Sequence, residues 1–203
     1  MSPSSQPLHF HELHGAALEP WLDKLGALRI AVFREYPYLY DGTLEYERDY
    51  LQTYVKSAGS LVVLVTDDDT NVLGATTCLP LKDEGPEFQQ PFVKHGYVID
   101  EVCYFGESIL LAPLRGRGIG KEFFKRREAH AQKLGVKWTA FCAVDRANDH
   151  PQKPAGYRPL SEFWEAQGYE RRPELQASFV WKEINEAAES PKTLTFWLKS
   201  WQS

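Results

Sequence analysis

Two hydrophobic periods alternate along this chain. Apolar residues that alternate with histidines predict a half-buried strand over residues 7–13. A period of about 3.6 residues predicts a helix over residues 17–36, which Pro37 ends. A second helix is expected over residues 43–57, because the hydroxyl of Thr43 can cap its first turn.

Strand-like runs dominate the rest of the chain. Residues 61–66 and 71–79 flank the polar run 67–70, which favours a tight reversal, so a hairpin is predicted. The remaining segments are, in order, an irregular stretch or short helix (86–95), strand material (98–111), a helix (116–134), a strand (137–144), a long loop (145–160), a short helix (161–167) and two strands (177–184 and 193–201). This order indicates an α/β protein with a mixed sheet, and one domain over residues 1–203 is expected.

The composition narrows the class of partner. Hydrophobic residues make up 43% of the chain and charged residues 25%, as in soluble globular proteins. Lys plus Arg number 23 and Asp plus Glu number 28, so the net charge of −5 argues against nucleic acid or an anionic membrane as a partner. No export signal and no apolar run of about 18 residues is found. We expect a cytoplasmic protein in which the isolated Cys78, Cys103 and Cys142 are reduced.

The most informative stretch joins a strand to a helix through closely spaced glycines. Gly116, Gly118 and Gly120 stand at every second position where the helix over residues 116–134 is predicted to begin. Glycine lets the backbone approach a ligand closely, and the N–H groups of a helix N-terminus converge on an anion. A phosphate or pyrophosphate fits such a turn. The alternative is a glycine-rich helix start flanked by solvated arginines.

Two common phosphate-binding motifs are excluded by the residues at their key positions. A Walker loop needs glycine and then serine or threonine at the positions held by Arg115 and Glu122. A dinucleotide fingerprint that starts at Gly118 needs glycine where Phe123 stands. The turn therefore belongs to a different class of phosphate site.

The motif that remains is Arg-x-x-Gly-x-Gly at residues 115–120, and it resembles the turn of the GNAT superfamily of acyl-CoA N-acyltransferases. The order of elements and the run from Phe163 to Tyr169, with Gly168 before the tyrosine, are also similar to that family. The resemblance implies a GNAT-like fold with a central, mostly antiparallel twisted sheet flanked by helices. It also implies transfer of an acetyl group from acetyl-CoA to the amine of a small molecule or peptide, without a metal.

The resemblance also assigns residues to the cosubstrate. The backbone N–H groups of residues 117–121 would hold the CoA pyrophosphate, with Arg115 and Gly116 shaping the turn. The N–H of Leu110 would polarise the thioester carbonyl. The cofactor-binding residues implied in this way are Leu110, Leu111, Arg115, Gly116, Arg117, Gly118, Ile119, Gly120, Lys121 and Trp164.

The reaction needs a base for the amine and a proton for the departing thiolate. Glu107 is the expected base, because it stands at a position where the family often carries a glutamate; the alternative is a carboxylate with a structural hydrogen bond. Trp164 replaces the tyrosine that commonly serves as the acid. Tyr157 or Tyr104 is then the candidate donor, unless the thiolate leaves to solvent. We expect Cys142 to be an inert buried thiol rather than a nucleophile.

The family layout places the acceptor between the first two helices and the loop over residues 145–160. The predicted substrate-binding residues are Tyr36, Tyr38 and Tyr40. Together with Glu35 and Asp41, they would suit a cationic or aromatic amine. The alternative is that these tyrosines pack their loop against itself.

Three further hypotheses concern the function of the protein, its acyl donor and its oligomeric state. A non-catalytic acyl-CoA-binding module is the main alternative to an enzyme, and a longer acyl donor fits the same motifs. An apolar strand over residues 194–198 could pair across subunits of a homodimer.

The histidines near the N-terminus lack the spacing of a zinc motif, so no metal site is expected. Arg127 and His130 fall on the apolar arc of their helix, where we expect them to snorkel toward water; the alternative for Arg127 is a specific partner.

Overall fold

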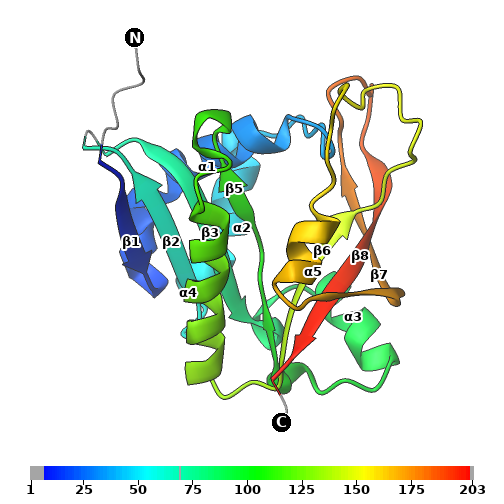
Figure 1. Ribbon diagram of the computed structural model, residues 1–203. Helices are drawn as coiled ribbons and strands as arrows, with labels where there is room; N and C mark the ends of the chain where they lie inside the picture. The colour runs from blue at the N-terminus through cyan, green and yellow to red at the C-terminus, as the bar shows by residue number, and fades with distance from the viewer. Residues whose placement is uncertain (1–6, 69, 202–203) are drawn as a thin grey trace.

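The computed structural model describes residues 7–68 and 70–201 (Figure 1). Residues 1–6, on which the expected lack of an export signal rests, and Asp69 of the predicted reversal lie outside that part. The strands are β1 (His9–Leu13), β2 (Leu61–Thr66), β3 (Val72–Pro80), β4 (Val102–Tyr104), β5 (Ser108–Leu110), β6 (Trp138–Val144), β7 (Glu170–Trp181) and β8 (Ser190–Ser200). The helices are α1 (Leu22–Phe33), α2 (Leu44–Lys56), α3 (Pro86–Lys94), α4 (Ile119–Lys133) and α5 (Ser161–Ala166), with 3-10 turns at Gly15–Trp21, Leu81–Asp83, Ile99–Glu101 and Ala112–Leu114.

The strands form one mixed, mostly antiparallel sheet, as expected. They lie in the order β1, β2, β3, β4, β6, β8 and β7, while β5 pairs with β3. In the described part of the chain only β4 and β6 run parallel. Figure 1 shows α4 and α5 on one face of this sheet and α1 and α2 on the other.

The strand β2, next to the edge strand β1, is buried on both faces. Its residues Val62 and Leu64 pack in the core beneath α1, α2 and α3. Its residues Leu61, Val63 and Val65 pack on the opposite side, in the cores that include α4. Double burial explains why residues 61–65 are all apolar rather than alternating.

The strand before the glycine turn loses one of its two neighbours midway. β4 lies between β3 and β6, and Phe105 extends the pairing with β6 by donating its N–H to the Ala140 carbonyl (2.7 Å). Gly106 then donates to the Thr77 carbonyl of β3 (3.1 Å), and β5 continues along β3. The strand material expected over residues 98–111 is therefore two short strands, and β5 and β6 diverge.

Arg127 lies inside the protein behind this break, so the expectation that it snorkels is wrong. Its side chain is 2% exposed, and its guanidinium stands 4.3 Å and 4.8 Å from the ring centroids of Phe105 and Phe124. It donates to the Glu107 carbonyl at 3.4 Å. Burial lowers the pKa of this guanidinium. His130 is half-buried, and its Nε2 contacts a backbone carbonyl at 2.8 Å.

The helix expected over residues 17–36 is divided. Its first part is the 3-10 turn Gly15–Trp21, and α1 begins only at Leu22. Pro20 accounts for the division, because proline has no N–H to donate and crowds the preceding turn of an α-helix.

The C-terminal strands also differ from expectation. β8 is bonded to β6 on one side and β7 on the other, so the argument that residues 194–198 offer a free edge to a second subunit is wrong. β7 begins at Glu170, earlier than the predicted residue 177. An irregularity between Arg172 and Gln176 lets the strand pass Pro173, which cannot donate to a ladder.

Several local predictions are confirmed. β2 and β3 form the antiparallel hairpin. Thr43 caps α2 by accepting the Tyr46 N–H at 3.3 Å. Cys78, Cys103 and Cys142 are free and buried. No helix among the described residues is long and apolar enough to cross a membrane.

Only glycine fits at position 106, where the chain parts from β6. A Cβ at this position would overlap the Tyr54 hydroxyl and lie 2.6 Å from the Thr77 hydroxyl. We predict that Gly106→Ala lowers the free energy of unfolding by about 1–3 kcal/mol, the usual effect of overpacking, in urea denaturation. Adding Tyr54→Phe removes one overlapping atom, so the double variant should lose less than the sum of the two single variants. Additive losses would contradict this explanation.

Candidate functional site

The glycine turn presents backbone N–H groups to open space. Gly116 and Gly118 have φ angles of 77° and 84°, and a Cβ on either would meet no atom within 4 Å. Glycine is favoured here by backbone conformation rather than by crowding. Gly118 is the N-cap of α4 and no side chain caps this end. At this positive end of the helix dipole, the Lys121 N–H donates to the Gly118 carbonyl (3.1 Å), and the N–H groups of Ile119 and Gly120 keep their capacity to bind an anion.

Arg115 fixes the turn against the strand that precedes it. Its Nε donates to the Leu110 carbonyl (3.0 Å), and its Nη1 pairs with Glu35 Oε2 (2.7 Å). Arg117 and Lys121 are exposed beside the turn, so two cations flank its N–H groups. Among the other predicted cofactor-binding residues, Leu111 and Gly120 are half-buried and Ile119 is buried.

The backbone N–H of Leu110 points away from β3. In the ladder between β3 and β5, Leu111 donates to the Leu73 carbonyl (3.0 Å), while Leu110 stands opposite Gly74. Bonded and non-bonded pairs alternate along an antiparallel ladder. The N–H of Leu110 is therefore directed to the side on which β5 and β6 diverge.

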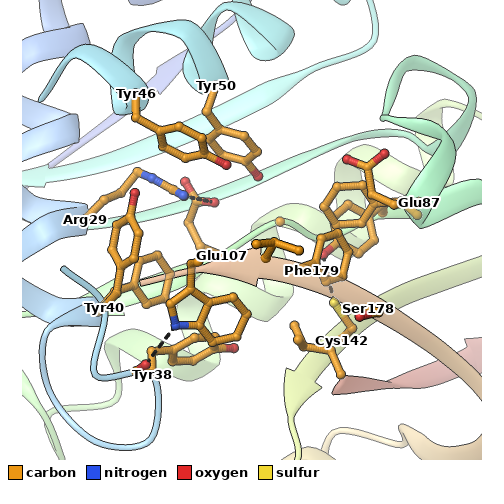
Figure 2. Close-up of a pocket in the computed structure, with 17 residues that line it drawn as sticks. Arg29, Tyr38, Tyr40, Tyr46, Tyr50, Glu87, Glu107, Cys142, Ser178 and Phe179 are labelled. Atoms are coloured by element: carbon orange, nitrogen blue, oxygen red, sulfur yellow. Dashed lines mark hydrogen bonds and ion pairs between the residues drawn. The ribbon is translucent and has the colours of Figure 1, made fainter. Parts of the chain in front are cut away.

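A pocket of about 370 Å³ lies on the face of the sheet that carries α1, α2 and α3 (Figure 2). Its walls come from those helices, from the loop after α1 and from β4, β6, β7 and β8. Glu107 and Gly106, at the break between β4 and β5, are part of the lining. Nine of the lining side chains are aromatic.

A buried cluster of charges forms one side of this pocket. Arg29 Nη1 pairs with Glu107 Oε2 at 2.5 Å, and Arg29 Nε pairs with Glu47. The guanidinium also stands over the ring of Tyr50, 4.3 Å from its centroid. Burial opposes the charge, but Glu107 and Glu47 hold the pKa of Arg29 well above its ordinary value. The cation is thus engaged on two of its nitrogens.

Glu107 retains one carboxylate oxygen that no protein group uses. Its Oε2 belongs to the ion pair, whereas the buried Oε1 has no hydrogen-bond partner within the described part of the chain. Its backbone N–H donates to the Thr77 hydroxyl at 3.2 Å, which fixes the residue at the break. The residue predicted to be the base therefore lines the pocket with unused hydrogen-bonding capacity.

The three tyrosines predicted to bind substrate occupy two environments. Tyr38 and Tyr40 line the pocket. Tyr36 is not among the lining residues and packs on Tyr157 and His150, with ring centroids 4.7 Å and 5.6 Å away. Tyr36 therefore joins the loop after α1 to the loop after β6.

A second contact holds the same two loops together. Arg146 donates from Nε to the Pro37 carbonyl (2.6 Å) and from Nη2 to the Tyr38 carbonyl (3.2 Å). Tyr157 lies in this region outside the pocket lining, and burial raises the pKa of its phenol, with Tyr36 adding to the effect. Of the two candidate acids, Tyr157 is thus a protonated phenol beside the pocket at neutral pH, whereas Tyr104 lines the pocket.

The carboxylates expected to attract an ammonium ion are engaged elsewhere. Glu35 pairs with Arg115. Asp41 pairs with Arg34 (3.2 Å) and Lys182 (2.9 Å). Their charges are therefore balanced by neighbours, and neither residue lines the pocket.

Trp164 is half-buried against the core, and Cys142 is a buried residue that lines the pocket. Trp164 packs against Phe141 and Trp197, with ring centroids 5.1 Å away in each case. The Cys142 thiol contacts the Tyr104 hydroxyl at 3.2 Å, and burial raises the pKa of this thiol to about 12. Little thiolate is present at neutral pH, in keeping with the expected inert thiol.

The N-terminal histidines make separate hydrogen bonds. His9 contacts Asp68 (2.7 Å), His11 contacts Thr66 (2.9 Å), and His14 contacts a backbone carbonyl (2.7 Å). Among residues 7–68 and 70–201, no group of three or more His, Cys, Asp or Glu side chains is placed to hold a metal ion.

Sequence reasoning missed the partners of Glu107, although a signal was present. Arg29 shares the buried side of α1 with Leu25 and Leu28, and Glu47 shares the buried side of α2 with Leu51. Charged residues are rarely buried unless they are paired. Two opposite charges on the buried arcs of successive helices therefore point to an ion pair between them.

A further buried carboxyl was also missed. Glu84 is 7% exposed; its Oε2 accepts the Gly85 N–H (3.3 Å), and its Oε1 has no partner among the described residues. Burial raises the pKa of Glu84 to about 8; the Gly85 N–H opposes this shift and the charge of Glu107 reinforces it. Glu84 is therefore mostly protonated at neutral pH.

Known proteins that are similar to this chain are found by comparing structures, not sequences. No protein-family model and no curated protein sequence matches the chain. An acetyltransferase of the GNAT family from Staphylococcus aureus is similar with a TM-score of 0.59, over 97% of this chain and 100% of its own, at 9% identity. A ribosomal-protein-alanine N-acetyltransferase from Brucella melitensis is similar with a TM-score of 0.59, over 94% and 99%, at 16% identity. An acetyltransferase from Streptococcus agalactiae has a TM-score of 0.59, over 95% and 98%, at 12% identity.

These similarities cover nearly all of each chain. The chain has the GNAT fold. The sheet and flanking helices inferred from the turn at residues 115–120 are thereby confirmed. In this GNAT fold, the pocket, the outward N–H of Leu110 and the glycine turn follow one another along the strand segment that parts from β6.

Glu84 makes the stability of this GNAT fold depend on pH. Its pKa rises from an ordinary 4.5 to about 8 on folding, so the folded state keeps a proton that the unfolded state releases. The free energy of unfolding should therefore fall as pH rises from about 4.5 to about 8. Glu84→Gln removes this titration. We predict that the free energy of unfolding of Glu84→Gln minus that of the wild type, measured by urea denaturation, increases by a few kcal/mol between pH 5 and about 8.5. A difference that does not change with pH would refute the assignment.

Proposed function

We propose that this protein is an N-acetyltransferase that transfers an acetyl group from acetyl-CoA to an amine by direct attack within a ternary complex. One observation carries the proposal: three features follow one another along a single strand segment. They are the carboxylate of Glu107 in the pocket, the outward N–H of Leu110, and the glycine turn. The GNAT fold, shared with acetyltransferases, supports the same reaction.

The residues around the turn fit acetyl-CoA. Two glycines with positive φ, open space beside them and an uncapped helix N-terminus are suited to a pyrophosphate. The exposed Arg117 and Lys121 add positive charge. In this proposal the N–H groups of residues 117–121 bind the pyrophosphate, and acetyl-CoA supplies the activated thioester.

The backbone N–H of Leu110 stabilises the reacting carbonyl. Negative charge develops on the carbonyl oxygen when the amine attacks, and an N–H that is already oriented stabilises it without reorganisation. Such donors contribute roughly 3–4 kcal/mol in other enzymes. Divergence of β5 from β6 leaves this N–H available to the thioester.

Glu107 removes the proton from the amine. Its Oε1 accepts a proton from the acceptor ammonium, directly or through a water molecule, so that the nitrogen lone pair can attack. The C–N bond forms, the C–S bond breaks with its electron pair going to sulfur, and the nitrogen releases its second proton to solvent to give the neutral amide. The resulting thiolate takes a proton from solvent or from Tyr157. Trp164 has no acidic hydrogen to supply.

A non-catalytic acyl-CoA-binding module is the second candidate. Two observations favour it: Trp164, which stands in place of the usual tyrosine acid, packs against Phe141 and Trp197, and Arg29 already engages one oxygen of Glu107. A module of this kind binds acetyl-CoA but releases no CoA when amines are added. Assays of CoA release with a panel of amines therefore separate the two functions.

The charge at position 118 tests the cosubstrate site. We predict that Gly118→Asp weakens acetyl-CoA binding at least tenfold in calorimetric titration, because a carboxylate in the turn repels the pyrophosphate. Gly118→Asn is the matched control, since it places a neutral side chain of the same shape on the same positive-φ backbone. Equal losses in the two variants would show that the effect is conformational and would contradict anion binding here.

The base is tested by an isosteric change. Glu107→Gln should lower kcat about 10²–10⁴-fold, the typical contribution of general acid–base catalysis. The Kd for acetyl-CoA should stay unchanged. Glu170→Gln, on the exposed start of β7, is the control and should keep the wild-type kcat. An unchanged kcat in Glu107→Gln would rule out this residue as the base.

A further inference from the structure

Aromatic rings make up most of the pocket wall opposite the charged cluster (Figure 2). The rings of Phe88 on α3 and Phe179 on β7 are in contact, with centroids 4.5 Å apart. Tyr38 and Trp181 form another pair, 6.1 Å apart. A ligand with an apolar body would lose water-exposed surface against these rings.

The charges of the pocket are unbalanced. Arg29 is the only cation among the described residues that line it, and it is engaged by both Glu47 and Glu107. Glu87 also lines the pocket, from the exposed first turn of α3. Three formal negative charges therefore accompany one positive charge.

This imbalance selects the charge of the acceptor. An ammonium ion gains attraction both from the carboxylates and from the faces of the aromatic rings. A carboxylate on the acceptor would instead meet Glu87 and Glu107, and the one cation in the lining is already paired. Like charges placed together at a binding site are strongly unfavourable.

The volume limits the size of the acceptor. About 370 Å³ is near the lower end of the range of about 300–1,000 Å³ that is usual for small-molecule pockets. The loops that carry Tyr38 and Arg146 are hydrogen-bonded to each other beside the pocket. A small molecule fits such a site better than a peptide.

We infer that the acceptor is a small primary amine with an aromatic or similarly bulky apolar body and no acidic group. This inference rests on the proposed acetyltransferase function. The ammonium group faces Glu107 Oε1, the ring lies among Phe88, Phe179 and Trp181, and Glu87 discriminates against acids.

The first test uses two amines that differ only in a carboxylate. Phenethylamine and phenylalanine carry the same ring and a primary amine, and a short alanine-terminated peptide represents the macromolecular acceptors. We predict that kcat/KM for phenethylamine exceeds that for each of the other two by about tenfold or more. A higher value for phenylalanine or the peptide overturns the inference and leaves the proposed function standing. If no amine of any class is acetylated, both fail.

A charge series at position 87 tests the source of the discrimination. The ratio of kcat/KM for phenethylamine to that for phenylalanine should fall from wild type to Glu87→Gln, and again to Glu87→Lys, by about tenfold overall. Glu87 is exposed, so these variants should fold, which circular dichroism checks. A ratio that stays constant across the series overturns the role of Glu87 as the discriminating charge.

A ring deletion tests the aromatic wall. Phe179→Leu should raise KM for phenethylamine more than for butylamine, because only the aromatic acceptor uses the lost ring face. Trp201→Leu removes a ring outside the pocket and is the matched control, with wild-type KM for both amines. Equal effects of Phe179→Leu on both amines would count against recognition of a ring.

Discussion

The point between Phe105 and Glu107 where the chain parts from β6 is the constraint on which the rest of the site depends. Through Phe105 this stretch of chain is bonded to β6, and β4 also pairs with β3; from Gly106 onward it follows β3 alone, so β5 and β6 separate. The N–H of Leu110, which points away from β3, is therefore directed to the side on which the two strands diverge, and Glu107 lies in the pocket. Groups on both sides hold the break: the Tyr54 hydroxyl lies against Gly106, and Arg127, stacked on aromatic rings, donates to the Glu107 carbonyl.

Arg29 links this break to the two helices above it. Its ion pairs with Glu47 of α2 and with Glu107 join α1, α2 and the strand at one buried point. Burying such a cluster is unfavourable unless its geometry is good, so its presence calls for a reason beyond stability. Here it orients one oxygen of Glu107 and leaves the other unused, and it removes the only cation of the described pocket lining from contact with an acceptor. The proposed base and the proposed selectivity thus depend on the same ion-pair cluster.

Features with a local cause were readable from the sequence. The hairpin of residues 61–66 and 71–79, the cap at Thr43 and the turn at residues 115–120 each depend on neighbouring residues in the chain. Features that depend on distant partners were not. Glu35 and Asp41 looked available to a substrate, but their charges are matched by cations elsewhere in the chain. The interior place of β8 likewise follows from sheet order, which no local pattern encodes.

The central claim is that the acetyl group is held at the open edge of β5, and the amide of Leu110 reports on it directly. In protein labelled with ¹⁵N-leucine, this amide can be assigned from the signal that Leu110→Ile removes. We predict that acetyl-CoA shifts its proton resonance downfield, and that CoA, which lacks the thioester carbonyl to accept the hydrogen bond, shifts it much less. An unchanged Leu110 resonance in protein saturated with acetyl-CoA would contradict the account.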